Sequence, residues 1–215
     1  TQYAINLSAW ILRAVSQVEV TDENGALASR TRLFYDDESF SGGNAQQVSK
    51  SNLTLRQEWS DPIAGTAIKT ARTRYDTYGN PITLLDPLAT NEAGGHVRRI
   101  AWDATFHTFP ITETVQLGDG KPALIYRAEH DSGFGSITAS TDFNAQRTAF
   151  GYDVFGRLIS LVKPGDSAAL PTAEYDYQLA TPYGASGLVN FTETRNLDRD
   201  ASAAGTKRDH YFITR

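Results

Sequence analysis

The feature that most constrains the fold is a repeated unit of the form Tyr-Asp-x-aromatic-Gly. One copy lies within residues 73–82 and another within residues 150–159. In both copies an apolar segment follows the glycine and ends at a proline turn. Internal similarity of this kind is typical of chains built from related supersecondary units. The sequence therefore predicts a repeat architecture.

Degenerate copies of the unit extend it along the chain. They are Tyr35-Asp36, Trp102-Asp103, His130-Asp131 and Tyr175-Asp176. Together with Asp76 and Asp153, the repeated aspartates lie 22 to 40 residues apart. Such irregular intervals are expected for hairpins that share a sheet but have loops of different lengths.

The residue types of the repeat favour a turn. An aspartate at a strand end can accept a hydrogen bond from the backbone N–H two residues later. A glycine three places after it suits the positive φ that such turns need. The amphipathic ring before the aspartate is expected to stack on rings of neighbouring hairpins, at ~0.2–1 kcal/mol per contact. The residues predicted to have these structural roles are Tyr75, Asp76, Gly79, Trp102, Asp103, Asp131, Tyr152, Asp153, Gly156, Arg157, Tyr175 and Asp176.

The rest of the sequence has the pattern of antiparallel strands. Short segments rich in Val, Ile, Thr, Tyr and Phe alternate with Gly, Asn, Asp and Pro clusters. Hairpins are expected across residues 22–25, 60–62 and 118–120. Longer loops are expected at residues 40–51 and 196–208. The predicted fold is all-β, with antiparallel hairpins forming a curved sheet in one segment over residues 1–215.

Composition excludes several classes of function. The net charge is −5, and the 20 Lys and Arg residues are interspersed with 25 Asp and Glu residues. A nucleic-acid partner is not expected, because backbone binding needs clustered positive charge. Cysteine is absent, which excludes disulfides and thiolate sites. No apolar segment has the ~20 residues of a membrane helix, and the absence of any Met suggests an internal part of a longer protein.

Candidate catalytic and metal-binding groups have simpler interpretations. The four histidines lack metal-ligand spacing. A glycosidase pair could be assembled from the carboxylates, but the repeat places most of them in turns. The cluster Asp36-Asp37-Glu38 with Asn44 could bind calcium, although a solvated loop is favoured. No catalytic residue, cofactor or metal is therefore predicted, and the chain is not expected to be an enzyme.

Aromatic residues leave one alternative open. They form 11% of the chain, and the repeated Tyr with Trp102 could line a carbohydrate-binding face. Packing between hairpins accounts for the same residues without a ligand.

Residues 141–158 resemble the YD-repeat (Rhs) family. They read Asp142-Phe143-Asn144-Ala145-Gln146, then a Thr-containing strand, then Tyr152-Asp153-Val154-Phe155-Gly156-Arg157-Leu158. The divergent stretches between repeats look most like the B component of bacterial insecticidal toxin complexes. The self-cleaving aspartyl protease motif of the family is not found.

The resemblance implies a function. In that family, β-hairpins form a hollow shell that encloses a toxic C-terminal polypeptide and helps to deliver it. The implied partners are other segments of the shell, a C-component-like toxin protein and a pore-forming A component reached through other regions. A secreted or cell-surface bacterial protein is expected, without membrane insertion by this segment. An adhesion or glycan-binding module of the same repeat class is the alternative.

Overall fold

The structure is a computed structural model that describes residues 1–61, 65–182, 184, 187–198 and 206–214. These residues form fifteen β-strands, and no α-helix occurs among them. The prediction of an all-β fold is confirmed. In the same part of the chain, no helix has the length and apolar character needed to cross a membrane.

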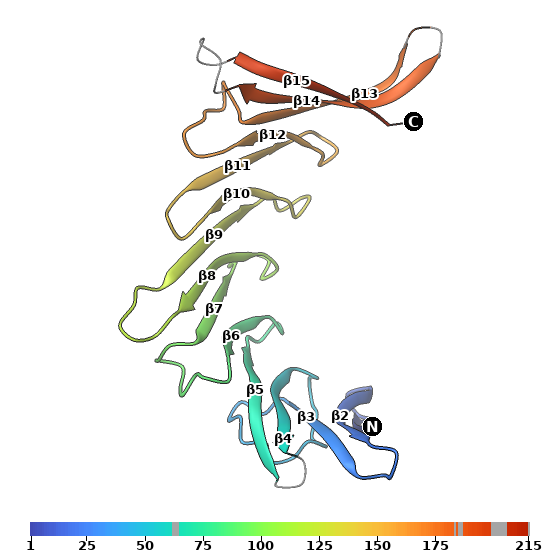
Figure 1. The fold of residues 1–215 in the computed structure, drawn as a ribbon, viewed down its shortest axis with the longest axis vertical. Helices are drawn as coiled ribbons and strands as arrows, with labels where there is room; N and C mark the ends of the chain where they lie inside the picture. Colours follow the sequence, from blue (N-terminus) through green and yellow to red (C-terminus); the bar gives the residue numbers. More distant parts are fainter. Residues whose placement is uncertain (62–64, 183, 185–186, 199–205, 215) are drawn as a thin grey trace. The chain divides into compact units, whose positions relative to one another are not determined.

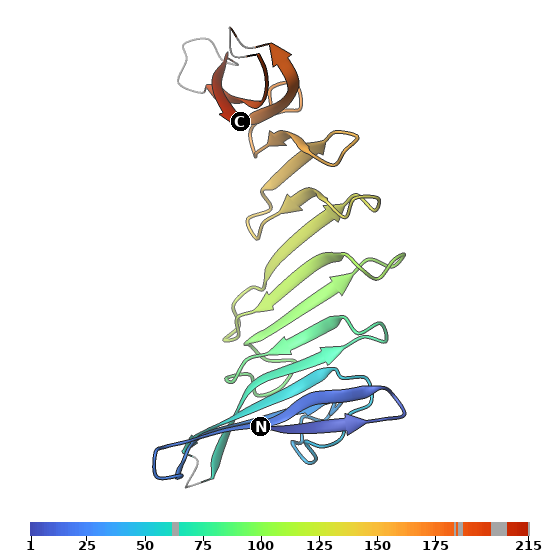
Figure 2. The same ribbon diagram turned by 90° about the vertical axis from the view of Figure 1, so that its right-hand side faces the viewer.

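The chain divides into two compact units, residues 1–125 and 126–215. The boundary lies inside β9. Within each unit, consecutive strands pair antiparallel in the order of the chain (Figures 1 and 2). The first unit contains β1 (Gln2–Asn6), β2 (Ile11–Thr21), β3 (Leu27–Tyr35), β4 (Leu53–Asp61), β5 (Thr66–Tyr75), β6 (Pro81–Leu85), β7 (Val97–Trp102) and β8 (Pro110–Gln116).

The second unit contains most of β9 (Leu124–His130), followed by β10 (Ile137–Thr141), β11 (Arg147–Tyr152), β12 (Leu158–Val162), β13 (Ala173–Pro182), β14 (Leu188–Asp198) and β15 (Thr206–Thr214). Strands β14 and β15 occupy both ends of the loop that was expected at residues 196–208. The centre of that loop, residues 199–205, lies outside the described residues. So does Pro62 of the turn expected at residues 60–62.

The hairpin between β2 and β3 illustrates how local sequence sets the register. Asp22 donates its backbone N–H to the carbonyl oxygen of Ala26 at 2.8 Å. Gly25 has a φ of 82°, which glycine adopts without steric cost. The turn places Gln17 opposite Arg32.

The core of the first unit lies on one face of its sheet. Phe34 pairs with Leu55, and Leu85 pairs with Val97, and all four side chains are buried. Two loops supply the rest of this cluster, through Phe40 and Ala45 from one and Ala89 from the other. The first loop, residues 36–52, includes the loop expected at residues 40–51.

A second, smaller cluster contains Ala4, Ala14 and Val48. In the second unit, the buried apolar residues that the structure describes are Ala139 and Ala173. The large apolar side chains that the structure describes in that unit are therefore at most partly buried.

Candidate functional site

The residues singled out by the repeat lie in turns between consecutive strands. Asp153, directly after β11, accepts hydrogen bonds through Oδ1 from the backbone N–H groups of Phe155 and Arg157, both at 2.9 Å. Its own carbonyl oxygen accepts from the N–H of Gly156 at 3.0 Å. Gly156 has a φ of 75°. The carboxylate therefore satisfies backbone donors that the turn would otherwise leave without protein partners.

Asp76 makes the same turn after β5. Its Oδ1 atom accepts from the N–H groups of Tyr78 at 2.8 Å and Asn80 at 2.9 Å. Gly79 has a φ of 89°. The two clean copies of the sequence repeat thus form equivalent turns.

Asp103 closes a longer turn after β7. Its two carboxylate oxygens accept from four backbone N–H groups, and the donors are Thr105, Phe106, Thr108 and Phe109. His107 has a φ of 52° in this turn, a conformation uncommon for residues other than glycine.

Asp131 accepts from the N–H groups of Gly133 and Phe134, both at 2.9 Å, and Gly135 has a φ of 71°. The chemistry of the turn is retained when its length changes.

Further aspartates form turns of this kind. Asp142 accepts from the N–H groups of Asn144 and Gln146, both at 2.9 Å, and Ala145 has a φ of 60°. This turn is hard to predict from the sequence, because Ala145 occupies the position where glycine is expected. We use the name aspartate turns for the set formed by Asp22, Asp36, Asp76, Asp103, Asp131, Asp142 and Asp153.

Asp36 holds a much longer loop. Its carboxylate accepts from the backbone N–H groups of Ser49, Lys50, Ser51 and Asn52. The loop leaves the sheet after Asp36 and returns to the same carboxylate thirteen to sixteen residues later. A single side chain therefore closes the loop that covers the core.

Electrostatics keeps several of these carboxylates ionised. Hydrogen bonds from the backbone of Phe109 and Phe106 hold the pKa of Asp103 well below its usual value. For Asp76 and Asp153, partial burial raises the pKa, but hydrogen bonds outweigh it and the net pKa is lowered. Groups of this kind act as acceptors and are poor proton donors at neutral pH.

At four of these turns, the aromatic residue before the aspartate contacts the preceding strand. The Tyr75 hydroxyl donates to the carbonyl oxygen of Leu53 at 3.0 Å. Tyr152 donates to Ile137 in the same way at 2.9 Å. The same contact joins the Trp102 indole N–H to Pro81 and the Tyr35 hydroxyl to Val15. These groups therefore join strands through hydrogen bonds to the backbone, whereas ring stacking was expected.

The pair Tyr175-Asp176 differs from the expectation. Both residues lie inside β13, and Asp176 pairs with Glu193 of β14. The role of the strand-end aromatic falls instead to Tyr177, whose hydroxyl donates to the carbonyl oxygen of Leu158 at 2.9 Å. The guanidinium group of Arg157 lies 4.4 Å from the centre of the Tyr177 ring. No glycine follows Asp176 at the required spacing, so the strand continues.

Successive turns in a unit also contact each other. The rings of Tyr78 and His107 stack with centroids 3.9 Å apart. Asn80 donates through its side-chain amide to the carbonyl oxygen of His107 at 2.7 Å. In the second unit, a Cβ atom on Gly156 would lie 3.0 Å from the ring of Phe134. Each of these pairs joins two hairpins at their turns.

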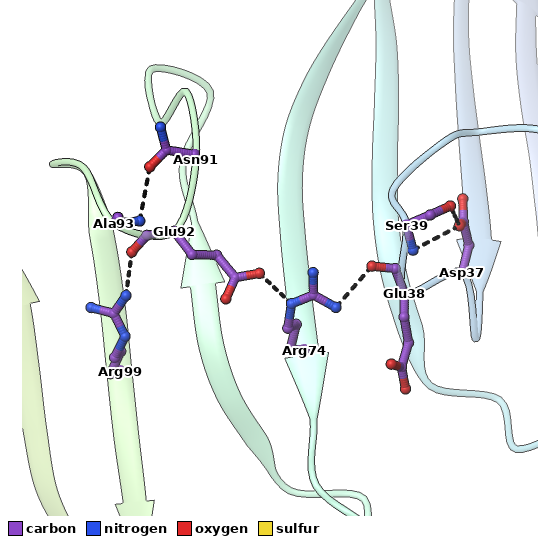
Figure 3. Close-up of polar contacts among 8 residues, drawn as sticks. All are labelled: Asp37, Glu38, Ser39, Arg74, Asn91, Glu92, Ala93 and Arg99. Atoms are coloured by element: carbon purple, nitrogen blue, oxygen red, sulfur yellow. Dashed lines mark hydrogen bonds and ion pairs between the residues drawn. The ribbon is translucent and has the colours of Figure 1, made fainter.

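Arg74 connects the two loops that cover the core of the first unit (Figure 3). Its guanidinium donates to the carbonyl oxygen of Glu38 at 2.8 Å and pairs with the carboxylate of Glu92. The same group lies 4.8 Å from the centre of the Phe40 ring. Arg99 donates to the carbonyl oxygen of Glu92. Local spacing does not indicate this arrangement, since Glu38 and Glu92 are 36 and 18 residues from Arg74.

The acidic cluster considered for calcium is used inside its own loop. The Asp37 carboxylate accepts from Ser39, Ser41 and Gly42. Among the described residues, no group of three or more His, Cys, Asp or Glu side chains is arranged to hold a metal ion.

The chain matches no family model and no curated protein. Among solved structures it is similar to a chain of TcdB2-TccC3-TEV, with 15% identity and a TM-score of 0.47 over 84% of this chain. It is also similar to a chain of TcdB2-TccC3-Cdc42, with 13% identity and a TM-score of 0.46 over 96% of this chain. This chain covers 10% of each of those chains. With both TM-scores below 0.5, we base no assignment on these matches.

Proposed function

We propose that the chain is a wall segment of a toxin-complex or Rhs-type β-shell that encloses a toxic polypeptide and helps to deliver it. The resemblance of residues 141–158 to the YD-repeat family supports this proposal. Its partners would be other segments of the same shell, a C-component-like toxin protein and, through other regions, a pore-forming A component. Such a protein would be secreted or lie at the bacterial surface.

The observation that carries the proposal is the way hairpins are joined. Tyr75, Trp102 and Tyr152 each bind a backbone carbonyl of the preceding strand. The turns within each unit are joined by contacts such as Tyr78 with His107. Contacts of this kind can be repeated for any number of hairpins, because each hairpin needs only its neighbours. The wall of a shell needs contacts that repeat over many hairpins, whereas an active site does not.

We infer further that the chain has no catalytic role. The carboxylates of Asp76, Asp103 and Asp153 are occupied by backbone donors, and their pKa values are lowered. A glycosidase acid needs a raised pKa. The repeat aspartates therefore fit a structural role.

Electron cryo-microscopy of the longer polypeptide that carries this chain tests the proposal. We expect a hollow particle in which residues 1–215 form part of the wall and the cavity contains protein density. A compact particle without a cavity, or a wall formed without this chain, would contradict it.

An adhesion or glycan-binding module is the alternative, and exposed rings at the turns favour it. Tyr78 is 64% exposed and Phe155 is 75% exposed, unlike the half-buried Tyr75 and Tyr152. Glycan-array signals that disappear in Tyr78→Ala and Phe155→Ala variants would support this alternative over the purely structural one.

A further inference from the structure

A groove crosses strands β5 to β8 of the first unit. It has a volume of about 470 Å³, within the usual range for ligand-binding pockets. Its central row is formed by Thr73, Leu84, Arg98 and Val115. Each of these residues is the register partner of the next, so they lie side by side on one face of the sheet.

This face is opposite the covered core. Leu85 and Val97, which are buried in the core, directly adjoin Leu84 and Arg98 in the sequence. Because alternate side chains of a strand point to opposite faces, the loops that contribute Phe40 and Ala89 to the core do not cover the groove. The groove is thus an open apolar surface on a sheet whose other face is closed.

One edge of the groove is fixed by short contacts. The imidazole Nδ1 of His96 lies 3.0 Å from an Asp86 carboxylate oxygen. Near this pair, a Cβ atom on Gly95 would lie only 2.3 Å from the Cα of Gly118. The two backbones therefore meet directly, which only glycine permits, and hold the edge of the groove in place.

Charged groups along the groove are matched within the protein. Arg98 forms an ion pair with Glu113, and His96 lies against Asp86. The side chain of Arg72 is on the opposite face, because Arg72 pairs with the buried Leu85. What the groove offers an occupant is therefore chiefly the apolar surface of Ala71, Leu84, Val115 and Leu117. An uncharged, apolar occupant is complementary to it.

The length of the groove indicates the shape of the occupant. Neighbouring strands are ~4.8 Å apart, so four strands span roughly 15 Å. An extended peptide rises ~3.3 Å per residue, so about four or five residues cover this distance. We propose that the groove binds an extended, uncharged peptide segment through its apolar side chains. This proposal does not depend on the shell function, because the groove lies within one unit of the chain.

Binding of labelled peptides to the 215-residue chain, measured by fluorescence anisotropy, tests the proposal. The probe is Ser-Gly-Leu-Phe-Leu-Gly-Ser, and its polar counterpart is Ser-Gly-Asn-Gln-Asn-Gly-Ser. We expect the apolar peptide to bind at least about tenfold more tightly, since several apolar groups leave water on binding.

Two groove variants and one control locate the binding. Ala71→Leu fills the groove and is expected to weaken binding about tenfold. Val115→Thr replaces one methyl group by a hydroxyl at nearly constant shape and should weaken it about fourfold. Ala101→Leu changes an equally exposed alanine of β7 outside the groove and should bind normally.

Three results would overturn the proposal. One is equal binding of the two peptides or binding of neither. Another is normal binding by Ala71→Leu, which would place the peptide outside the groove. If Ala71→Leu does not fold, normal binding by Val115→Thr would lead to the same conclusion. The third is displacement of an apolar dye from the groove by small aromatic compounds but not by the apolar peptide.

Discussion

The Tyr75 hydroxyl donates a hydrogen bond of 3.0 Å to the carbonyl oxygen of Leu53, the first residue of the preceding strand. Burial raises the pKa of Tyr75, so the hydroxyl remains a donor at neutral pH. Tyr152 and Ile137 have the same relationship in the second unit. The aromatic residue of the repeat thus joins one strand to the strand before it.

Removing this hydroxyl should weaken the sheet. We expect Tyr75→Phe and Tyr152→Phe each to lower the free energy of unfolding by about 1 kcal/mol, because each leaves a carbonyl group without its donor. Urea unfolding measures the change. Tyr78→Phe, which keeps the exposed ring on His107, is the matched control and should have little effect. Equal stabilities of all three variants and the parent would contradict this role.

The carboxylate of Asp103 should matter more than one outside an aspartate turn. Asp103→Asn keeps the shape of the side chain but removes one of its two acceptor oxygens. In the parent protein, those two oxygens accept hydrogen bonds from four backbone N–H groups. We expect a lower free energy of unfolding in urea, because the amide oxygen that remains cannot accept all four hydrogen bonds. Asp119→Asn is the control, since Asp119 has a φ of 53° that asparagine tolerates well. A loss in the control as large as in Asp103→Asn would refute the assignment.

Acid should destabilise the protein through these turns. The pKa values of Asp36, Asp76, Asp103 and Asp153 are all lower than the ordinary 3.8. A lowered pKa stabilises the fold above the unfolded-state value, and this contribution is lost as pH falls through the folded-state value. The urea concentration at the midpoint of unfolding should therefore be constant above about pH 5 and fall steeply below about pH 4. Asp103→Asn should reduce the slope; an unchanged slope would count against this explanation.

Gly156 combines two constraints that can be separated. Its φ is 75°, and a Cβ atom would lie 3.0 Å from the ring of Phe134. Gly156→Ala should cost ~1–2 kcal/mol from backbone strain, plus the displacement of the ring. Gly165→Ala, at a φ of 90° with open space around it, should show the strain alone. Thermal unfolding of both variants measures the difference, and equal losses would mean that the Phe134 contact has no energetic effect.

Local sequence predicts the turns because their hydrogen bonds are local. At residues 76–80, the aspartate, the glycine and the donors all lie within five residues, so spacing alone identifies the turn. The prediction failed at Asp176, where no glycine follows and pairing with β14 extends the strand. It also missed Asp142, because Ala145 adopts the positive φ without being glycine.

Long-range features left little signal in the sequence. Arg74 reaches Glu38 and Glu92 only because two loops fold over the same face of the sheet. The groove depends on the register that places Thr73, Leu84 and Val115 in one row. Neither the register nor the path of the loops could be derived from spacing along the chain.

Protection of an enclosed polypeptide tests the central claim most directly. In the longer protein, limited proteolysis should leave the enclosed C-terminal region intact while the same region alone is digested. A variant with Asp76→Asn, Asp103→Asn and Asp153→Asn should lose this protection, because its wall turns are weakened. A C-terminal region that is digested equally fast in the parent protein and alone would contradict the proposal that this chain is part of an enclosing wall.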